Sequence, residues 1–207
     1  MRQLLGRANS SNVMKAIWVL EELGLPYERI DAGGPFGRTH AARYMAMNPN
    51  SHVPTLEEDG FTLWESNAIL RYLCAANAPD SPLWPPDPRA RANVDRWMDW
   101  QQTTLGPPQT VVFQGLVRTA PELRDAGAIG AALLAAGAKW SLLDAQLAAH
   151  DYIAGSEFTL ADIASGVHAH RWFSFDVERP ATPRLRAWYE RLRQRPAYRA
   201  HCAMPMT

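Results

Sequence analysis

Residues 48–66, with the sequence NPNSHVPTLEEDGFTLWES, contain the pattern that decides the fold of this chain. Two short runs with the composition of strands, 53–56 and 61–64, flank an acidic segment that ends on a glycine, EEDG. Such a segment between two strand-like runs predicts a tight turn and therefore a β-hairpin. The apolar residues that follow recur at helical spacing, so we expect a helix over residues 66–76.

The chain before this hairpin predicts a β-α-β unit. Residues 3–6 and 27–31 have the composition of strands, and residues 11–24 carry apolar side chains at helical spacing and end on a glycine. Two strands joined in this way pair in parallel, with a right-handed crossover. A short helix near residues 40–47 leads into the hairpin. This order of elements is that of a thioredoxin-like domain, which we assign to residues 1–77.

The rest of the chain predicts helices. Residues 78–88, APDSPLWPPDP, are too rich in proline for a helix or a central strand and form the expected interdomain linker. Apolar residues at helical spacing then favour a helical bundle domain over residues 89–207. Gly106-Pro107-Pro108 interrupts the first of these helices, and because proline removes a backbone donor we expect a kink or break there. The predicted fold class is α/β followed by all-α.

The segment FTLADI, residues 158–163, has the signature of a helix start. Thr159 can cap the helix, and the carboxylate of Asp162 can reach back to Thr159. We therefore expect one helix of the second domain to begin here.

The composition excludes several classes of partner. Lys plus Arg and Asp plus Glu both number 21, so no net charge favours nucleic acid or a membrane surface. The N-terminal residues contain no apolar stretch of signal-peptide length, and we expect a cytoplasmic protein. The two cysteines, Cys74 and Cys202, have no CxxC spacing, which argues against a zinc site and a redox dithiol. We expect no metal and no disulfide, with both cysteines serving as packing residues.

Four motifs occur in order along the chain: GRANSSNVMK (6–15), HVPTL (52–56), WESNAILRYL (64–73) and FTLADI. With the two predicted domains and the linker, they give a chain that resembles the soluble glutathione transferase superfamily over its whole length. The first motif resembles the R-x-x-S-x-N-x-x-K start of a bacterial group within it. The resemblance implies a detoxifying enzyme with glutathione as co-substrate, a small electrophile as second substrate, and a homodimer. The eight tryptophans add to the expectation of a dimer, because one core of this size would not hold them all.

The resemblance places the glutathione thiol near Ser10, Ser11 and Asn12, where the first strand gives way to the first helix. A free cysteine thiol has a pKa of about 8.5, so activation needs a hydrogen-bond donor or a positive potential. By resemblance Ser10 is the predicted donor, with Asn12 in support; Ser11, one position along, is the alternative. These serines are also good helix caps, and one residue can serve each purpose.

The resemblance assigns the rest of glutathione to His52, Val53, Pro54, Glu65 and Ser66. In thioredoxin-like folds the proline of such a motif is cis, and the backbone of Val53 would pair with the cysteinyl unit as an added strand does. Ser66, at a helix N-terminus, would bind the γ-glutamyl carboxylate, and Glu65 the α-amino group. His52 is either a contact of the glycyl carboxylate or an exposed loop residue. Many relatives have arginine where this chain has Asn67, which weakens the expectation of a second charged clamp.

The resemblance also implies a pocket for the electrophile between the domains. Trp100, Gln101 and Thr104 share a helical face with Trp97, and Pro108 lies at the expected kink above them. We assign the second substrate to Trp100, Gln101, Thr104 and Pro108. Packing or dimer contact is an equally good interpretation of the two tryptophans.

The sequence therefore predicts a serine-type glutathione transferase. No cysteine lies near the first helix, which argues against members that form a mixed disulfide, and the first tyrosine, Tyr27, lies in the second strand. One alternative is a glutathione-dependent disulfide reductase, since such relatives have a Ser or Thr two residues before an Asn. A second is a non-catalytic binding protein of the same fold. The intact set of Ser10, Pro54, Glu65 and Ser66 argues against the second alternative.

Overall fold

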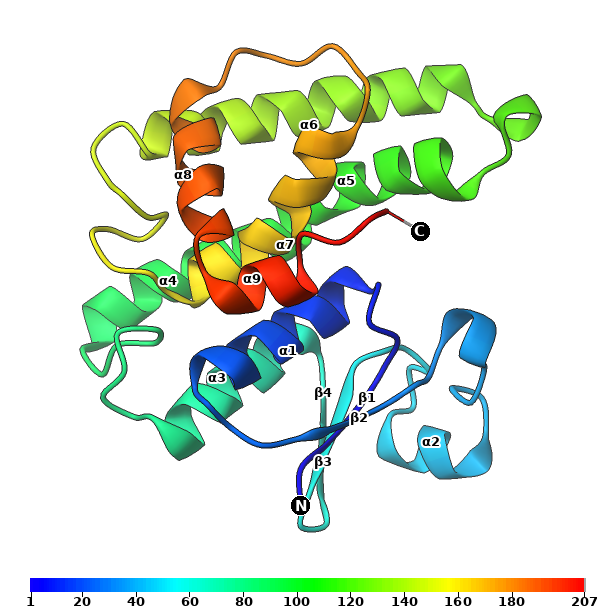
Figure 1. Ribbon diagram of the computed structural model, residues 1–207, viewed down its shortest axis with the longest axis vertical. Helices are drawn as coiled ribbons and strands as arrows, with labels where there is room; N and C mark the ends of the chain where they lie inside the picture. Colours follow the sequence, from blue (N-terminus) through cyan, green and yellow to red (C-terminus); the bar gives the residue numbers. More distant parts are fainter. Residues whose placement is uncertain (207) are drawn as a thin grey trace.

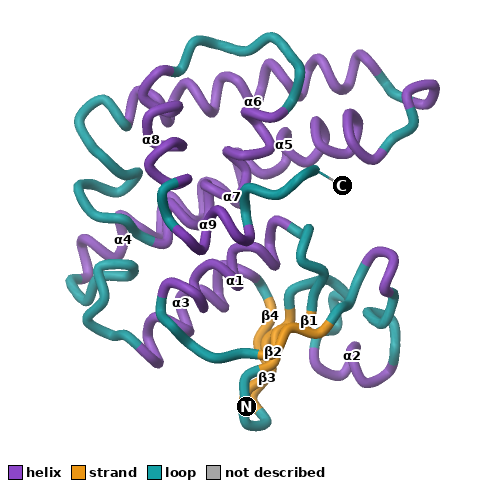
Figure 2. The backbone as a smooth tube through the Cα atoms, viewed as in Figure 1, coloured by secondary structure: helices purple, strands orange, loops and turns teal. Residues whose placement is uncertain are grey.

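A four-stranded mixed sheet lies at the centre of the N-terminal domain (Figure 1, Figure 2). The computed structural model describes residues 1–206, and the strands in them are β1 (Gln3–Leu5), β2 (Glu28–Ile30), β3 (Thr55–Glu58) and β4 (Phe61–Trp64). Their order across the sheet is β2-β1-β3-β4. β1 and β2 are parallel, and the other neighbouring pairs are antiparallel. The predicted β-α-β unit and hairpin are both present, which confirms the thioredoxin-like fold.

The hairpin turn is shorter than the sequence suggested. Glu57 and Glu58 continue β3 and pair with residues of β4. Only Asp59 and Gly60 form the turn, and both have positive φ angles, of 51° and 84°. Positive φ at both positions is typical of a type I′ turn, for which Asp-Gly is a favoured pair. The turn thus has two residues in place of the expected four.

The second domain consists of helices, as predicted. The α-helices of the described residues are α1 (Ser11–Glu22), α2 (Ala42–Met47), α3 (Ser66–Asn77), α4 (Pro88–Trp100), α5 (Gly106–Phe113), α6 (Ala126–Gln146), α7 (Leu160–Ser174), α8 (Pro183–Arg193) and α9 (Pro196–His201). α1 and α3 lie between the sheet and the second domain (Figure 1). Because successive strand residues face opposite sides, Leu4 joins the core on the side of α1, whereas Leu5 packs with Tyr44 of α2.

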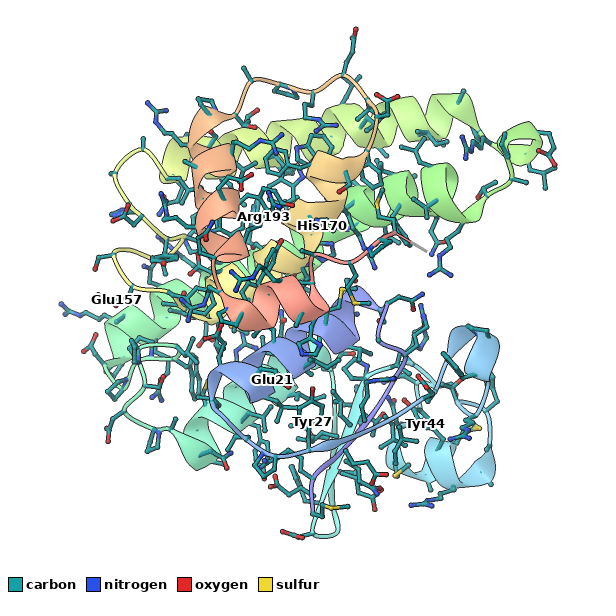
Figure 3. The ribbon with its side chains drawn as sticks, viewed as in Figure 1. Glu21, Tyr27, Tyr44, Glu157, His170 and Arg193 are labelled. Atoms are coloured by element: carbon teal, nitrogen blue, oxygen red, sulfur yellow. The ribbon has the colours of Figure 1, made fainter. Side chains whose placement is uncertain are left out.

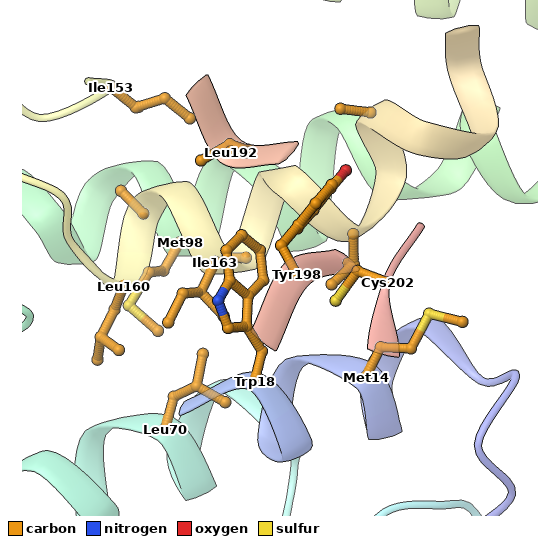
Figure 4. Close-up of a cluster of buried hydrophobic side chains, with 14 of the residues drawn as sticks. Met14, Trp18, Leu70, Met98, Ile153, Leu160, Ile163, Leu192, Tyr198 and Cys202 are labelled. Carbon is orange, nitrogen blue, oxygen red and sulfur yellow. The ribbon is translucent and has the colours of Figure 1, made fainter. Parts of the chain in front are cut away.

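One hydrophobic core joins the two domains, and α1 runs through it. The ring of Trp18 on α1 lies 4.7 Å from that of Tyr198 on α9 and 5.5 Å from that of Phe158 (Figure 4). Gly166 of α7 passes close to the same indole, and a Cβ there would come within 2.9 Å of the Trp18 ring. Every residue from 13 to 20 is buried, since α1 contacts α3 as well as α7 and α9.

A widened turn takes the place of the kink or break expected at Gly106-Pro107-Pro108. The backbone stays helical from residue 88 to residue 118, through α4, η2 (Gln101–Leu105), α5 and η3 (Gln114–Arg118). η2 and η3 are single turns of π-helix, and in η2 the N–H of Gly106 donates to the C=O of Gln101, five residues earlier. The wider turn accommodates the two prolines, which have no N–H to donate.

Most of the tryptophans are buried within this single chain. The buried ones are Trp18, Trp97, Trp140, Trp172 and Trp188, five of the eight. The number of tryptophans therefore gives no reason to expect a dimer, contrary to the expectation from the sequence. Cys74 and Cys202 are both free and buried, which confirms them as packing residues.

α6 is long and apolar enough to cross a membrane by length and composition alone, with a mean hydropathy of 1.4. In this fold it packs against α5 and α8 and buries Ala136, Trp140 and Leu143 in the core. Its opposite face is apolar too, and Leu134 and Leu142 there are 80% and 45% exposed. Since a helix of a bundle core passes the same test, α6 is described best as a bundle helix with one uncovered apolar face.

The predicted start of α7 is confirmed. The N–H of Thr159 donates to Asp162 Oδ2 at 2.9 Å, so the reciprocal contact of a capping box is present. Asp162 Oδ1 also accepts from the N–H of Ile153 at 2.9 Å and from Trp188 Nε1 at 2.8 Å. Burial raises the pKa of Asp162, and these hydrogen bonds act in the opposite direction. One carboxylate thus ties α7 to α8 and to the loop before it.

We predict that Asp162→Ala lowers the free energy of unfolding by about 3–5 kcal/mol, because it leaves buried donors without an acceptor. Urea denaturation followed by circular dichroism measures the change. Asp151→Ala is the matched control: its side chain is 74% exposed and its contact with Arg191 is 3.9 Å long, so we expect a change of under about 0.5 kcal/mol. Equal effects of the two substitutions would contradict this structural role of Asp162.

Candidate active site

Three adjoining cavities form a cleft at the boundary between the two domains. The first has a volume of about 520 Å³ and lies between the N-terminus of α1, the loop after β2, and the helices α5 and α7. The second, of about 290 Å³, lies between β4, the N-terminus of α3 and the segment 48–54. The third, of about 340 Å³, lies against α1 and η2. Asn12 lines all three, so the N-terminus of α1 is the centre of the cleft.

Ser10 is the N-cap residue of α1, just before its first residue, and its C=O accepts the N–H of Met14 at 2.8 Å. Its side chain makes no capping hydrogen bond and has no other hydrogen-bond partner within residues 1–206. The residue is 9% exposed and lines the first cavity. Ser11 lines the first and third cavities. Thus the hydroxyl of Ser10 is not used as a cap, although the residue occupies the cap position.

The N-terminus of α3 meets that of α1. Ser66 Oγ donates to Asn12 Oδ1 at 3.3 Å, which joins the first turns of the two helices. Glu65, just before α3, has a positive φ of 69°, an uncommon conformation for a residue other than glycine. Gln102 of η2 donates to Glu65 Oε2 at 3.3 Å from the second domain. Two helix N-termini side by side offer unpaired N–H groups and a positive potential, which favour anions.

The segment before β3 presents its backbone to the cleft. The peptide bond between Val53 and Pro54 is cis, which confirms the expectation from the sequence. Among the described residues, neither the N–H nor the C=O of Val53 takes part in a hydrogen bond. The C=O of His52, in contrast, accepts from Tyr44 Oη at 2.6 Å and from Asn48 Nδ2 at 2.8 Å. Tyr44 is part of α2, beside the sheet (Figure 3), and its hydrogen bond holds this segment in place.

His52 lies on the surface of the cleft. Its side chain is exposed, lines the first and second cavities, and has Nδ1 in a hydrogen bond with the C=O of Asn50. The structure thus places it at the cleft and at the surface together, in keeping with both interpretations from the sequence. Asn67 points elsewhere: its amide donates to the C=O of Met98 at 3.0 Å and accepts from Lys15.

A buried lysine lies beneath the N-terminus of α1. Lys15 Nζ donates to Gln101 Oε1 at 2.7 Å and to Asn67 Oδ1 at 3.4 Å. Burial lowers the pKa of Lys15 to about 7, and the charge of Glu65 opposes that shift. Gln101 Nε2 lies 3.0 Å from His168 Nε2, and burial together with the charges of Lys15 and Arg171 lowers the pKa of His168 well below its usual value. This chain of contacts links α1 to η2 and α7 across the domain boundary.

The predicted glutathione residues come together, and most of the predicted electrophile residues do not. Ser10, Ser11, Asn12, His52, Val53, Pro54, Glu65 and Ser66 all line the cleft. Gln101 lines it also, but is buried and bonded to Lys15. Trp100 packs against Trp97 with ring centroids 5.3 Å apart, and neither Trp100, Thr104 nor Pro108 lines the three cavities.

For Pro108, the reason is the widened turn η2, which precedes it; Trp100 comes before this turn and Thr104 lies within it. A π-turn contains one residue more than an α-turn, so the face that follows it shifts by one position. Beyond η2 the first cavity is lined by Gln109, Thr110, Phe113 and Gln114, and Pro108 falls outside it.

Several residues of the cleft were given no role from the sequence. Arg7 and Lys15 belong to the GRANSSNVMK motif, so a signal was present for them. Arg118 and Arg171 line the first cavity from η3 and α7. No local pattern points to either, because only the packing of the second domain brings them to the cleft. Within residues 1–206 no group of three or more His, Cys, Asp or Glu is arranged to hold a metal.

Comparison with known proteins agrees with this geometry. The sequence matches the families described as "Glutathione S-transferase, N-terminal domain" over residues 3–75 and "Glutathione S-transferase, C-terminal domain" over residues 126–191. It is 44% identical to Glutathione S-transferase GstB of Escherichia coli, with both chains covered completely. It is 32% identical to Glutathione S-transferase 3 of Zea mays, over 95% of this chain and 90% of that one. The theta class glutathione S-transferase of Xanthomonas axonopodis pv. citri, crystallised with glutathione bound, has a similar structure: the TM-score is 0.95 at 45% identity, with 100% and 99% of the two chains covered.

We predict that the burial of Lys15 makes folding stability depend on pH. Below pH 7 the amine is protonated in the folded and unfolded chains alike, and the cost of burying the charge is complete. Above pH 7 the folded chain releases this proton, while the unfolded chain retains it up to about pH 10.4. The unfolded state then binds more protons, so the free energy of unfolding rises with pH, by at most about 1.4 kcal/mol per unit.

The measurement is urea denaturation of the wild type and of Lys15→Met between pH 7 and pH 9. The difference between the two free energies of unfolding isolates the contribution of Lys15, and we expect it to increase in favour of the wild type as the pH rises. The same substitution at Lys139, which is partly exposed on α6, controls for loss of a lysine as such. A difference that does not change with pH would show that Lys15 keeps its proton.

Proposed function

The chain belongs to the soluble glutathione transferase superfamily, and on that basis we propose that it conjugates glutathione to a small electrophile through a thiolate held at Ser10–Asn12. The observation that carries this proposal is the meeting of two helix N-termini, joined by the contact of Ser66 with Asn12, beside the free backbone of Val53. A peptide with a carboxylate at one end and a thiol in its middle suits this arrangement, because the N–H groups favour anions and the free backbone favours an extended chain.

We assign each part of glutathione to a part of the cleft. The second cavity would hold the γ-glutamyl unit, with its carboxylate at Ser66 and its α-amino group at Glu65. The N–H and C=O of Val53 would pair with the cysteinyl unit, and His52 would lie toward the glycyl carboxylate. The positive φ of Glu65 supports its role, since a strained residue at the lip of a cavity is typical of a binding site.

Activation of the thiol requires its pKa to fall by about two units. Such a depression requires roughly 2.7 kcal/mol of preferential stabilisation of the thiolate. A hydroxyl donor contributes about 1.5–3 kcal/mol, and a helix N-terminus about 0.3–1 kcal/mol. Ser10 has a hydroxyl without a partner next to the first cavity, which supports it as the donor. Ser11 lines more of the cleft and remains the alternative.

The reaction then needs no other cofactor. The sulfur of the thiolate forms a bond with an electrophilic carbon, and the leaving group departs with its electron pair. The proton of the thiol leaves through the open cleft to solvent before the attack. In this step the enzyme binds the two substrates side by side and stabilises the thiolate anion.

We propose three further properties. The domains comprise residues 1–77 and 89–207 with a linker at 78–88, supported by the end of α3 at Asn77 and the start of α4 at Pro88. The protein acts in the cytoplasm, which two free, buried cysteines suit. It forms a homodimer, in which the exposed apolar face of α6 around Leu134 and Leu142 would be covered by the partner.

We predict that the thiol of bound glutathione titrates well below about 8.5, and that Ser10→Ala raises its pKa by about one to two units. At neutral pH the rate should fall roughly ten- to a hundredfold and recover in large part at high pH, where the thiol ionises unaided. The affinity for glutathione should change little, because Val53, Glu65 and Ser66 hold the rest of the tripeptide. Ultraviolet absorbance of the bound thiolate against pH is the measurement.

Two matched variants, Ser11→Ala and Asn12→Ala, decide between neighbouring residues. A shift in Ser11→Ala alone would assign the thiolate to Ser11. A shift in Asn12→Ala alone would favour the disulfide reductase, an alternative that the position of Asn12 in all three cavities supports. A wild-type pKa at the value of free glutathione would falsify thiolate activation and favour the binding protein.

We predict that light scattering gives a mass of about 46 kDa for the wild type, twice the 23.1 kDa of one chain. Leu134→Glu should shift the mass toward that of the monomer, because it places a charge on the apolar face of α6. Leu123→Glu is the control, since Leu123 is 75% exposed outside this face. A wild type that is monomeric at micromolar concentration would contradict the proposed dimer.

A further inference from the structure

One wall of the first cavity is strongly basic. It contains Arg7 from the loop after β1, Arg118 at the end of η3 and Arg171 near the end of α7. The aromatic ring of Phe113 is close to two of these groups: the guanidinium carbon of Arg171 is 4.0 Å from the ring centroid, and that of Arg118 is 5.4 Å away. We call Arg7, Arg118 and Arg171 the arginine cluster.

No carboxylate of the described residues neutralises the arginine cluster. Within residues 1–206 none of its members takes part in an ion pair, and no Asp or Glu lines the first cavity. Other partly buried arginines of the chain do have acidic partners: Arg2 pairs with Glu58, and Arg195 with Glu22 at 2.6 Å. The cluster therefore differs from Arg2 and Arg195, whose charges are neutralised by carboxylates.

The three charges are also close enough to repel one another. Burial and the charges of Arg118 and Arg7 lower the pKa of Arg171 to about 10. Burial and the charge of Arg118 lower that of Arg7, whose buried Nε has no partner among the described residues. Arg171 is held in place by a 2.8 Å hydrogen bond to the C=O of Asn9. Like charges held together in a partly buried cavity are stabilised by an anion that binds between them.

We propose that the first cavity selects electrophiles that carry a carboxylate, which the arginine cluster binds while Phe113 contacts the apolar part of the molecule. This inference rests on the proposed function, because Ser10 and Asn12 line the same cavity and would present the thiolate to the bound electrophile. The carboxylate proposed for the γ-glutamyl end lies in the second cavity, whose walls contain none of the three arginines. The glycyl carboxylate is proposed to lie toward His52, so we assign the arginine cluster to an anionic group of the second substrate.

The probe is 4-chloro-3-nitrobenzoate, with the neutral 4-chloro-3-nitrobenzamide as its match in size. In both, the glutathione sulfur forms a bond with C4, the C–Cl bond breaks, and chloride leaves with the electron pair; the thiol proton passes to solvent. The two compounds differ in intrinsic reactivity, so each kcat/KM is divided by the rate constant of the uncatalysed reaction with glutathione. We expect the wild type to favour the carboxylate at least tenfold on this scale.

Arg118→Gln tests the cluster, because the exposed side chain of Arg118 makes no ion pair or hydrogen bond among the described residues, so we expect the fold not to depend on it. The normalised kcat/KM for the carboxylate should fall about five- to tenfold, as expected for loss of a partly exposed charged hydrogen bond, and that for the amide less than twofold. Arg118→Lys should retain part of the preference. Arg89→Gln removes the same charge from an exposed site outside the cleft and should leave the preference unchanged.

Three results would overturn the inference. The first is equal normalised rates for the two compounds in the wild type. The second is a loss of glutathione affinity in Arg118→Gln or Arg7→Gln with an unchanged preference, which would assign the cluster to the glycyl carboxylate. The third applies if the protein binds glutathione but converts neither compound, in which case the proposed function fails and the inference is tested by binding alone. Calorimetry with 3-nitrobenzoate and 3-nitrobenzamide then decides: tighter binding of the acid, weakened by Arg118→Gln, supports the inference, and equal binding overturns it.

Discussion

The burial of α1 is the constraint on which the rest of the structure depends. α3 covers one side of this helix, and α7 and α9 cover the other, so both domains hold it. Trp18 packs where Gly166 has no side chain, and any larger residue at position 166 would push α1 away from α7. Because the helix is held on both sides, its N-terminus stays at the domain boundary. The cleft forms there, with Ser10 and Asn12 at its centre.

The same burial explains the charge distribution around the cleft. Lys15 lies on a helix without a solvent-facing side at that level, so amide oxygens surround its amine in place of water. Burial and the neighbouring cations lower the pKa of His168, which leaves that imidazole neutral. Glu65 is the single carboxylate among the described residues that line the three cavities. This charge distribution favours anions, in keeping with the thiolate and the carboxylates that we propose to bind here.

Local patterns account for what could be predicted from the sequence. The hairpin and the capping contact of Asp162 each depend on residues a few positions apart, where spacing reports geometry directly. The cis peptide before Pro54 was expected from the family resemblance, because the local sequence alone does not distinguish a cis from a trans proline. The widened turn η2 leaves no such trace, so the sequence did not indicate that Pro108, which follows the turn, lies outside the first cavity. The arginine cluster was beyond prediction for another reason. Its members approach one another only after η3 and α7 have packed over the N-terminal domain.

The two proposed substrate sites differ in the same way, because the N-terminal domain provides the glutathione site and the second domain provides most of the wall for the electrophile. The sites proposed for glutathione use backbone groups and helix N-termini, at Val53 and Ser66, which short motifs specify. The wall that we propose for the electrophile uses side chains of α5, η3 and α7, and those helices would form equally well with other residues at these positions. We therefore expect a change at position 118 to alter the selection of the second substrate without disturbing the proposed thiolate site or the core. The proposed selectivity would then reside in a few side chains on a scaffold that does not depend on them.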